Sequence, residues 1–256
     1  MPASSNKAWV VMPLYYYPLT ETTWKPLYDA IAAHPDTNFL VVVNPNSGPG
    51  ALPLPGHDYI REIPRLNAFE NVRTVGYVRI DYCRKPLRES LAEIRQYADW
   101  EVGHNIPGLH VQGIYVDETP NHASTERAEY LDAVRLYIKH VNGLLGERTV
   151  VHNPGTPPEG DLGLFGYPDL VCISEEPHQL FDGEGVQKRL AELPLDRVRS
   201  IYQLSGIPRQ QIRDVVHELC KRGQYVFATD LQDDFYESFG PSWEDFITAV
   251  DQSDKI

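Results

Sequence analysis

The sequence predicts a single-domain α/β fold, the (β/α)8 or TIM barrel, that spans residues 1–256. Short apolar runs alternate with amphipathic segments along the whole chain, and this alternation favours a parallel sheet covered by helices. Eight such runs occur, and the chain of 256 residues is close to the roughly 250 that a barrel of eight units needs. Polar and aromatic residues follow the runs, where barrel enzymes carry their functional groups.

The eight runs are predicted strands because most of them are rich in β-branched and aromatic residues. An open doubly wound sheet is the competing arrangement, but the chain contains neither G-x-G-x-x-G nor G-x-x-x-x-G-K-[ST]. The barrel is therefore favoured. In chain order, the predicted strands are Trp9–Leu14, Phe39–Val43, Val72–Ile80, His110–Asp117, Arg148–His152, Leu170–Ile173, Val198–Leu204 and Gln224–Thr229.

Four of the segments between the runs have apolar residues spaced by three and four, which predicts amphipathic helices that pack on the barrel. We expect Thr23 to cap the first of these helices and Gly223 to end the last. The segment Pro154–Pro168 is rich in Gly and Pro and predicts a long loop. The four apolar stripes are Trp24, Leu27, Tyr28, Ile31; Leu87, Leu91, Ile94, Ala98; Leu131, Val134, Ile138, Val141; and Ile212, Val215, Val216, Leu219.

Charge and composition exclude several classes of partner. The net charge is −13, which disfavours nucleic acid and anionic membrane surfaces and suits a neutral or cationic substrate. The odd number of cysteines, Cys83, Cys172 and Cys220, argues against a disulfide scaffold. The first residues, MPASSNKAWVVMP, contain no apolar stretch of the length a signal peptide has, so we expect an intracellular protein or a form from which a leader was removed.

Two of the predicted strands lead into pairs of acids, in the sequences HVQGIYVDE and LVCISEE. Two carboxylates that face each other are the minimal equipment of a glycosidase. The polar and aromatic residues at the ends of the predicted strands would all lie on one rim of the barrel. They are Tyr15, Tyr16, Tyr17, Asn44, Asp81, Tyr82, Asp117, Glu118, Asn153, Glu175, Glu176, Gln203 and Asp230.

Strand alternation selects one acid from the first pair. If Gly113 and Tyr115 face the barrel interior, Asp117 faces it too, because side chains change face at every residue. Alternation often fails at the last residue of a strand, so Glu118 remains a candidate.

The same reasoning selects one acid from the second pair. Val171, Ile173 and Glu175 are expected to share a face, and Glu176, beside Pro177, is expected to lie in a loop. Asp117 and Glu175 are therefore the predicted catalytic pair.

A glycosidase uses one carboxylate to attack or stabilise the anomeric carbon and the other to protonate the leaving oxygen. The acid needs a raised pKa, and we expect repulsion from Glu118 and Glu176 to raise it. Tyr15, Tyr16, Tyr17 and Tyr77 would offer aromatic faces on which sugar rings stack.

The sequence gives less support to catalysis by zinc, by a Schiff-base lysine or by a serine nucleophile. The nine histidines form no H-E-x-x-H, no lysine sits at a predicted strand end, and G-x-S-x-G is absent. We therefore expect no cofactor. A set of Asp and Glu side chains that holds Mg²⁺ stays open as an alternative.

Several motifs, in order along most of the chain, resemble those of the spherulin-4 family, which is classed with glycoside hydrolase family 135. The most specific of them is the loop NPNSGPG. Ile80 and Ser174 depart from the family pattern, which usually has Thr at the first position and often an aromatic residue at the second. The matching segments are Pro13-Leu14-Tyr15-Tyr16 with Pro18, Asn44–Gly50, Gly76-Tyr77-Val78 with Tyr82, Gly113–Glu118, Asn153-Pro154-Gly155 and Asp169–Glu175.

The resemblance implies a (β/α)8 barrel and endo-acting hydrolysis of α-1,4-linked galactosamine polymers such as fungal galactosaminogalactan. Members of the family are often secreted. The family's acidic residues correspond to Asp117, Glu118 and Glu175. Two alternatives remain: a catalytically silent polysaccharide-binding barrel, and a metal-dependent hydrolase that uses Asp117 with Glu118. The expected substrate-binding residues are Tyr15, Tyr16, Asn44, Tyr77, Asn153 and Glu176.

Overall fold

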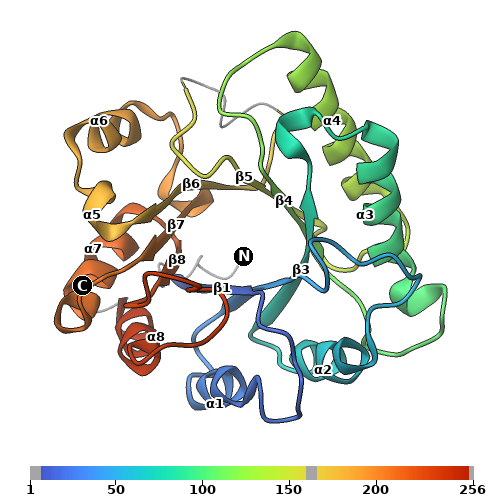
Figure 1. Cartoon of the computed structure of the whole chain (residues 1–256), viewed down its shortest axis with the longest axis horizontal. Helices are drawn as coiled ribbons and strands as arrows, with labels where there is room; N and C mark the ends of the chain where they lie inside the picture. The colour runs from blue at the N-terminus through green and yellow to red at the C-terminus, as the bar shows by residue number, and fades with distance from the viewer. Residues whose placement is uncertain (1–6, 160–165, 254–256) are drawn as a thin grey trace, which may run out of the picture.

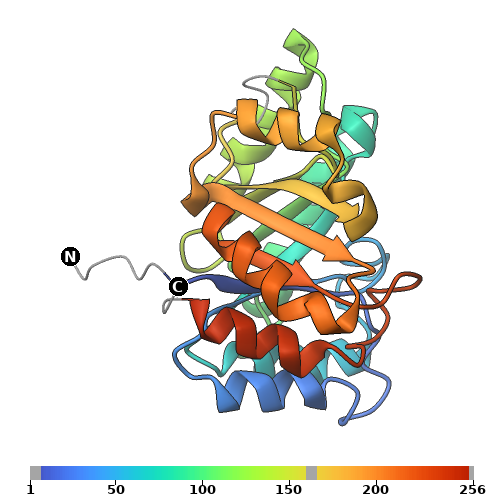
Figure 2. The ribbon, with the colours of Figure 1, turned by 90° about the vertical axis from the view of Figure 1, so that its left-hand side faces the viewer.

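The structure of the protein is a computed structural model, which describes residues 7–159 and 166–253. Its eight strands are parallel and close into a barrel in the order β1-β2-β3-β4-β5-β6-β7-β8, with β1 paired to β8. Figure 1 shows the strands around the centre and the helices outside them. In Figure 2, the barrel is seen from the side, with helices above and below the strands. The predicted fold class is confirmed.

The strands are close to their predicted bounds. The largest difference concerns β6, which continues through Glu175 and Glu176 to Pro177, so the prediction that Glu176 lies in a loop is wrong. The strands are β1 Trp9–Leu14, β2 Phe39–Val43, β3 Val72–Arg79, β4 Gly113–Asp117, β5 Thr149–Asn153, β6 Leu170–Pro177, β7 Ser200–Ser205 and β8 Tyr225–Ala228.

The four predicted apolar stripes lie on α1, α3, α4 and α7. Among the described residues, no helix is long and apolar enough to cross a membrane. In the predicted loop Pro154–Pro168, the described part contains no helix, and residues 160–165 lie outside the described residues. The helices are α1 Lys25–Ala33, α2 His57–Asn67, α3 Leu87–Val102, α4 Thr125–His140, α5 His178–Phe181, α6 Glu184–Glu192, α7 Ile212–Arg222 and α8 Trp243–Asp251.

One predicted helix cap, Thr23, is wrong, and the other, Gly223, is confirmed as the C-cap of α7. Trp24, not Thr23, occupies the N-cap position of α1, and the Thr23 hydroxyl instead accepts a hydrogen bond from the Thr20 amide. Gly223 follows α7 in an extended conformation with φ −131°. A glycine suits this position because a Cβ atom there would lie 2.5 Å from the ring of Tyr202. Close packing against Tyr202, and not a left-handed backbone, therefore explains why a glycine occupies this position.

A layer of polar side chains inside the barrel lies below the carboxyl ends of the strands. The amide nitrogen of Gln203 on β7 donates to the hydroxyl of Tyr115 on β4 at 2.8 Å and to the sulfur of Cys172 on β6 at 3.1 Å. All three side chains are buried. The layer links three strands across the interior and forms a fixed base under the rim.

Candidate active site

Asp117 ends β4 and receives hydrogen bonds from both neighbouring strands. The hydroxyl of Tyr77 on β3 donates to Oδ2 at 2.5 Å, and the amide Nδ2 of Asn153 on β5 donates to Oδ1 at 2.7 Å. Asn153 lies directly beside Asp117 in the register of β4 with β5. The parallel register therefore holds this carboxylate in place.

Glu175 on β6 shares a donor with Asp117. The same Nδ2 of Asn153 donates to Oε2 of Glu175 at 2.5 Å, and the hydroxyl of Tyr236 donates to Oε1. The amide oxygen of Asn153 accepts from the Gly155 amide at 3.0 Å, which fixes the orientation of the amide group. An amide nitrogen carries two hydrogens, so one group binds both acids and keeps their nearest oxygens within about 5 Å of each other.

A register slip decides which acid of β6 reaches the interior. Against β7, the pairing of β6 moves by one residue between Cys172 and Ser174, so Ile173 is an inserted residue. Cys172 faces the interior, where it contacts Gln203. Without the insertion, strict alternation would bring Glu176 inward; with it, the inward acid is Glu175.

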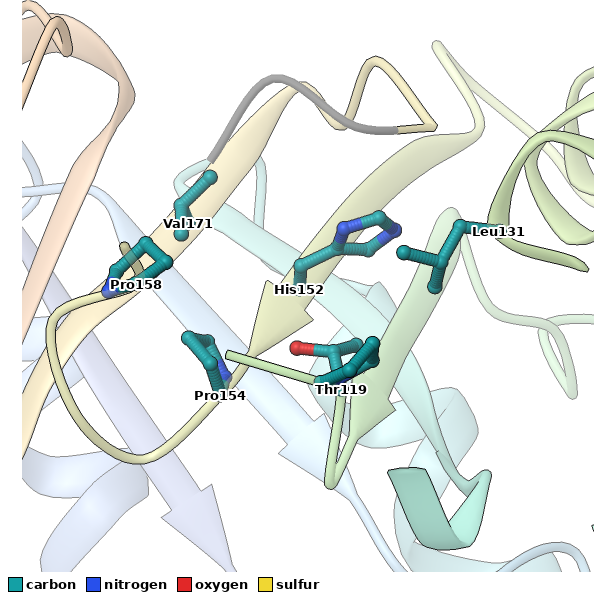
Figure 3. A pocket seen from close by; sticks show the side chains of 7 residues that line it. Thr119, Leu131, His152, Pro154, Pro158 and Val171 are labelled. Carbon is teal, nitrogen blue, oxygen red and sulfur yellow. The ribbon is translucent and has the colours of Figure 1, made fainter. Parts of the chain in front are cut away.

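The predicted choice of Glu175 agrees with this geometry, but the reasoning behind it is wrong. Val171 does not share a face with Glu175. It lines a small hollow between the barrel and α4, together with His152 and Leu131 (Figure 3).

His152 occupies the outer face of β5, behind Asn153. Figure 3 shows its ring beside the hollow, near Thr119 and Leu131. The hollow has a volume of about 10 Å³, which is room for about one water molecule. Burial lowers the pKa of His152 to about 3, so the imidazole is neutral at ordinary pH. His152 thus packs behind the site and carries no charge into it.

Burial is the main electrostatic influence on the two bridged acids. It raises the pKa of Glu175 to about 7; the charge of Asp117 adds to this rise, and the hydrogen bond from Asn153 opposes it. Burial also raises the pKa of Asp117, against the opposing hydrogen bond from Tyr77. The prediction that repulsion from Glu118 and Glu176 raises the pKa of the acid is wrong, because burial is the main cause. Glu118 adds a smaller repulsion to Asp117, and for Glu175 the repelling charge is Asp117.

The other two predicted acids have different neighbours. Glu118 has a left-handed backbone, with φ 52°, and its Oε2 accepts from Nε of Arg79 at 2.8 Å. Glu176 is half-buried. Burial raises its pKa, and the charge of Arg189 on α6 opposes the rise. The structure therefore brings Asp117 and Glu175 together and places Glu118 and Glu176 in separate surroundings.

Aromatic rings line the bridged pair. The Tyr15 ring centroid lies 5.5 Å from that of Tyr77 and 5.0 Å from that of Tyr236. Burial, followed by the charges of Asp117 and Glu175, raises the pKa of Tyr15. Tyr15 and Tyr77 thus form an aromatic wall beside the acids.

The remaining predicted binding residues lie around this centre. The Tyr16 ring packs against Phe239, with centroids 6.3 Å apart. The side-chain oxygen of Asn44 accepts from the Gly48 amide at 2.9 Å, so Asn44 organises the loop that follows β2. Asn153 was expected to bind substrate, but its amide binds both acids instead.

Tyr236 was not predicted from the sequence. It lies in the loop between β8 and α8, which has no apolar period. The ends of this loop are joined by reciprocal bonds: the Asp230 amide donates to the Ser242 hydroxyl at 3.0 Å, and the Ser242 amide donates to Oδ1 of Asp230 at 3.1 Å. Its position after a barrel strand, on the rim that carries the other candidates, was the one signal that could have suggested it.

Three comparisons place the chain among known proteins. Spherulin-4 from Physarum polycephalum is 32% identical over 173 residues, which are 68% of this chain but only 46% of that protein. The structure of Aspergillus clavatus Sph3 in complex with GalNAc is 33% identical, with a TM-score of 0.89, and the match covers 96% of this chain and 98% of that chain. A class V chitinase from Pseudomonas fluorescens Pf-5 is 11% identical, with a TM-score of 0.58 over 97% of this chain and 100% of the other, so it shares the fold.

The fold, the paired acids and the aromatic wall define a carbohydrate-active barrel. Residues 9–250 match the family described as Spherulation-specific family 4. The chain belongs to this family, which confirms the resemblance seen in its motifs.

The raised pKa of Glu175 predicts a stability effect that depends on pH. An acid whose pKa is higher in the folded state destabilises the fold as pH rises from its ordinary value of 4.5 to about 7. Glu175→Gln removes this effect. Relative to wild type, the free energy of unfolding of the variant should increase by on the order of 2–3 kcal/mol between pH 4.5 and 7.5.

Urea denaturation at a series of pH values would measure this change. Glu237→Gln, at an exposed position in the same loop as Tyr236, controls for the loss of one acidic side chain. A difference between Glu175→Gln and wild type that stays constant with pH would contradict the assigned shift.

Proposed function

We propose that the protein is an endo-acting glycoside hydrolase that cleaves α-1,4-linked galactosamine or N-acetylgalactosamine polysaccharide with retention of anomeric configuration. One observation carries the proposal: a single amide, that of Asn153, binds the partly buried carboxylates of Asp117 and Glu175 together at the rim of the barrel. Two acids held at short range are the equipment that glycosidic cleavage requires.

The environments of the two acids suggest separate roles. Glu175, with a pKa of about 7, keeps its proton near neutral pH and can donate it to the leaving oxygen. Hydrogen bonds from Tyr77, from the Glu118 backbone and from Asn153 all lower the pKa of Asp117 and favour its charged form, whereas the bond from Asn153 alone lowers the pKa of Glu175. Asp117 is accordingly the proposed nucleophile and Glu175 the proposed acid and then base.

The reaction then proceeds in two displacements. The Asp117 carboxylate forms a bond to the anomeric carbon while the glycosidic C–O bond breaks and Glu175 gives its proton to the departing oxygen. Glu175, now charged, takes a proton from water, and the oxygen of that water replaces Asp117 at the anomeric carbon. The short separation of the acids favours this course. Retaining enzymes place their carboxyl groups roughly 5–5.5 Å apart, whereas inverting enzymes leave roughly 6.5–9.5 Å for a water molecule.

The proposed substrate rests on the family and on charge. The Aspergillus clavatus relative, 33% identical over nearly the whole chain, has a structure in complex with GalNAc. The net charge of −13 suits a partly deacetylated polymer, which carries positive amino groups.

The alternatives find less support in the site. Ser174, one of the two departures that suggested a silent binder, is buried beside Glu175 on the opposite face of β6, so it leaves the bridged pair intact. A metal site at Asp117 and Glu118 would need the second carboxylate, which is paired with Arg79. Among residues 7–159 and 166–253, no group of three or more His, Cys, Asp or Glu side chains is arranged to hold a metal.

Removal of either acid should abolish turnover. We expect Asp117→Asn and Glu175→Gln each to reduce the release of reducing ends from partly deacetylated α-1,4-galactosamine polymer by more than about 10³-fold, with folding retained. Wild type and Glu176→Gln, which changes an acid outside the pair, serve as controls. Wild-type rates in both pair variants would refute the assignment, and binding of the polymer without cleavage by wild type would favour the silent barrel. Loss of activity with a chelator would favour the metal-dependent alternative.

The pH profile should follow the state of the proton on Glu175. Because the general acid must be protonated, kcat/KM should fall as pH rises through about 7. Initial rates between pH 4 and 9 would show this limb. A rate that still increases above pH 8 would be incompatible with Glu175 as the acid.

The stereochemical outcome tests the short separation of the acids. Proton NMR of the first products, recorded before mutarotation, should show the α-anomer. An initial β-product would mean that the acids move apart when substrate binds, and that water attacks directly.

A further inference from the structure

We propose that the segment of residues 79–84, which follows β3, is a sugar-binding subsite in which the ring of Tyr82 stacks on a pyranose unit beside the bridged acids. This inference rests on the proposed function and extends it, because it assigns a position for a second sugar unit of the polysaccharide.

The backbone of this segment has an unusual conformation. Asp81, Tyr82 and Cys83 are three consecutive non-glycine residues with positive φ, at 49°, 54° and 66°. Side chains disfavour this left-handed region, so the conformation persists only where its surroundings impose it. Such backbone strain is concentrated at functional sites. Here the turn gives Tyr82 an orientation that an ordinary helical turn or strand would not give.

Hydrogen bonds attach the turn to the end of β4, where the proposed nucleophile lies. The Tyr82 amide donates to the Glu118 carbonyl at 2.8 Å, and the Ile80 amide donates to the Asp117 carbonyl at 3.1 Å. Tyr82 is therefore fixed to the backbone of the residue that follows Asp117. A sugar unit on Tyr82 would lie next to the unit that reacts.

The ring of Tyr82 is both exposed and supported. It is 42% exposed, which is high for a large aromatic side chain in this barrel. The guanidinium of Arg84 lies 5.5 Å from its centroid, and Arg84 is itself held by Asp81 at 2.5 Å. One side of the ring is thus occupied by a cation, and the exposed part is available to the apolar face of a sugar.

Charged side chains of the same segment and of the end of β4 match the hydroxyl groups of a sugar. Nε of Arg79 donates to Glu118, and Nη2 of Arg79 lies 3.7 Å from Asp81. The side chain of Arg79 is 50% exposed and that of Glu118 is 29% exposed, so both donors and acceptors remain accessible at this place. This gives Glu118 a role in substrate binding, in place of a third catalytic acid.

The experiment compares Tyr82→Ala with Tyr167→Ala. Tyr167 is a matched control: it is 71% exposed, has φ 43°, and has the guanidinium of Arg135 at 5.7 Å from its centroid. It precedes β6 and therefore lies at the opposite end of the barrel. The substrates are α-1,4-linked galactosamine oligosaccharides of defined length and the partly deacetylated polymer.

We expect Tyr82→Ala to raise KM for long oligosaccharides by about tenfold with little change in kcat, because stacking stabilises the bound ground state and the transition state alike. A disaccharide should be affected much less, because it is too short to fill a second subsite. Tyr82→Trp should retain the wild-type KM. Tyr82→Gly should raise KM as Tyr82→Ala does, but with Tm unchanged or higher, because glycine accepts the left-handed φ. An unchanged KM in Tyr82→Ala, or an equal rise in Tyr167→Ala, would overturn the subsite.

Binding in the Asp117→Asn background separates this inference from the proposed function. If wild type does not cleave the polymer, calorimetric titration of the oligosaccharides into Asp117→Asn and into Asp117→Asn/Tyr82→Ala still tests the subsite. An affinity that is lower by about tenfold in the double variant supports the subsite even when the hydrolase proposal fails. Equal affinities, or no binding to Asp117→Asn, would refute the subsite.

Discussion

The amide of Asn153 is the interaction on which the site depends. Two carboxylates buried near each other repel, and each loses its hydration, so an isolated pair would not remain charged or fixed in position. One nitrogen with two hydrogens satisfies an oxygen of each acid, and the Gly155 amide prevents the group from rotating. The parallel register of β4, β5 and β6 places the amide between the acids. The barrel thus brings three neighbouring strand ends into one hydrogen-bonded unit.

Besides Asn153 on β5, each acid accepts a hydrogen bond from a tyrosine hydroxyl. One of these tyrosines lies on a strand and the other in a loop. Tyr77 donates to Asp117 from the adjacent strand β3, whereas Tyr236 donates to Glu175 from the loop that follows β8. One acid is therefore held wholly by the barrel, and the other is held in part by a loop whose ends are joined through Asp230 and Ser242. The rings of Tyr77 and Tyr236 both pack against that of Tyr15, so the barrel and the loop together cover the acids. Burial, the main cause of the raised pKa of Glu175, thus depends on the loop as well as on the strands.

Much of the fold and part of the site could be predicted because both follow from short-range patterns. β1 and β2 have their predicted bounds, since each is a single apolar run with clear ends. Asp117 could be chosen by counting alternate residues along β4, which is regular. Tyr236 could not be predicted, because a loop residue has no period that reveals its direction. The separation of Glu118 from the bridged acids also depends on the backbone, since a left-handed residue at the end of β4 turns its side chain towards Arg79.

By itself, the sequence determined the eight-unit barrel, its rim of polar residues and the two strands that carry acids, because apolar periodicity and composition are properties of the chain alone. Only the tertiary structure decided that Glu175 and not Glu176 meets Asp117. The deciding feature is the inserted residue Ile173, which reverses the side-chain alternation of β6. Such an insertion exists only relative to a neighbouring strand, here β7, and a pairing between strands far apart in the sequence leaves no mark in the local pattern of either one.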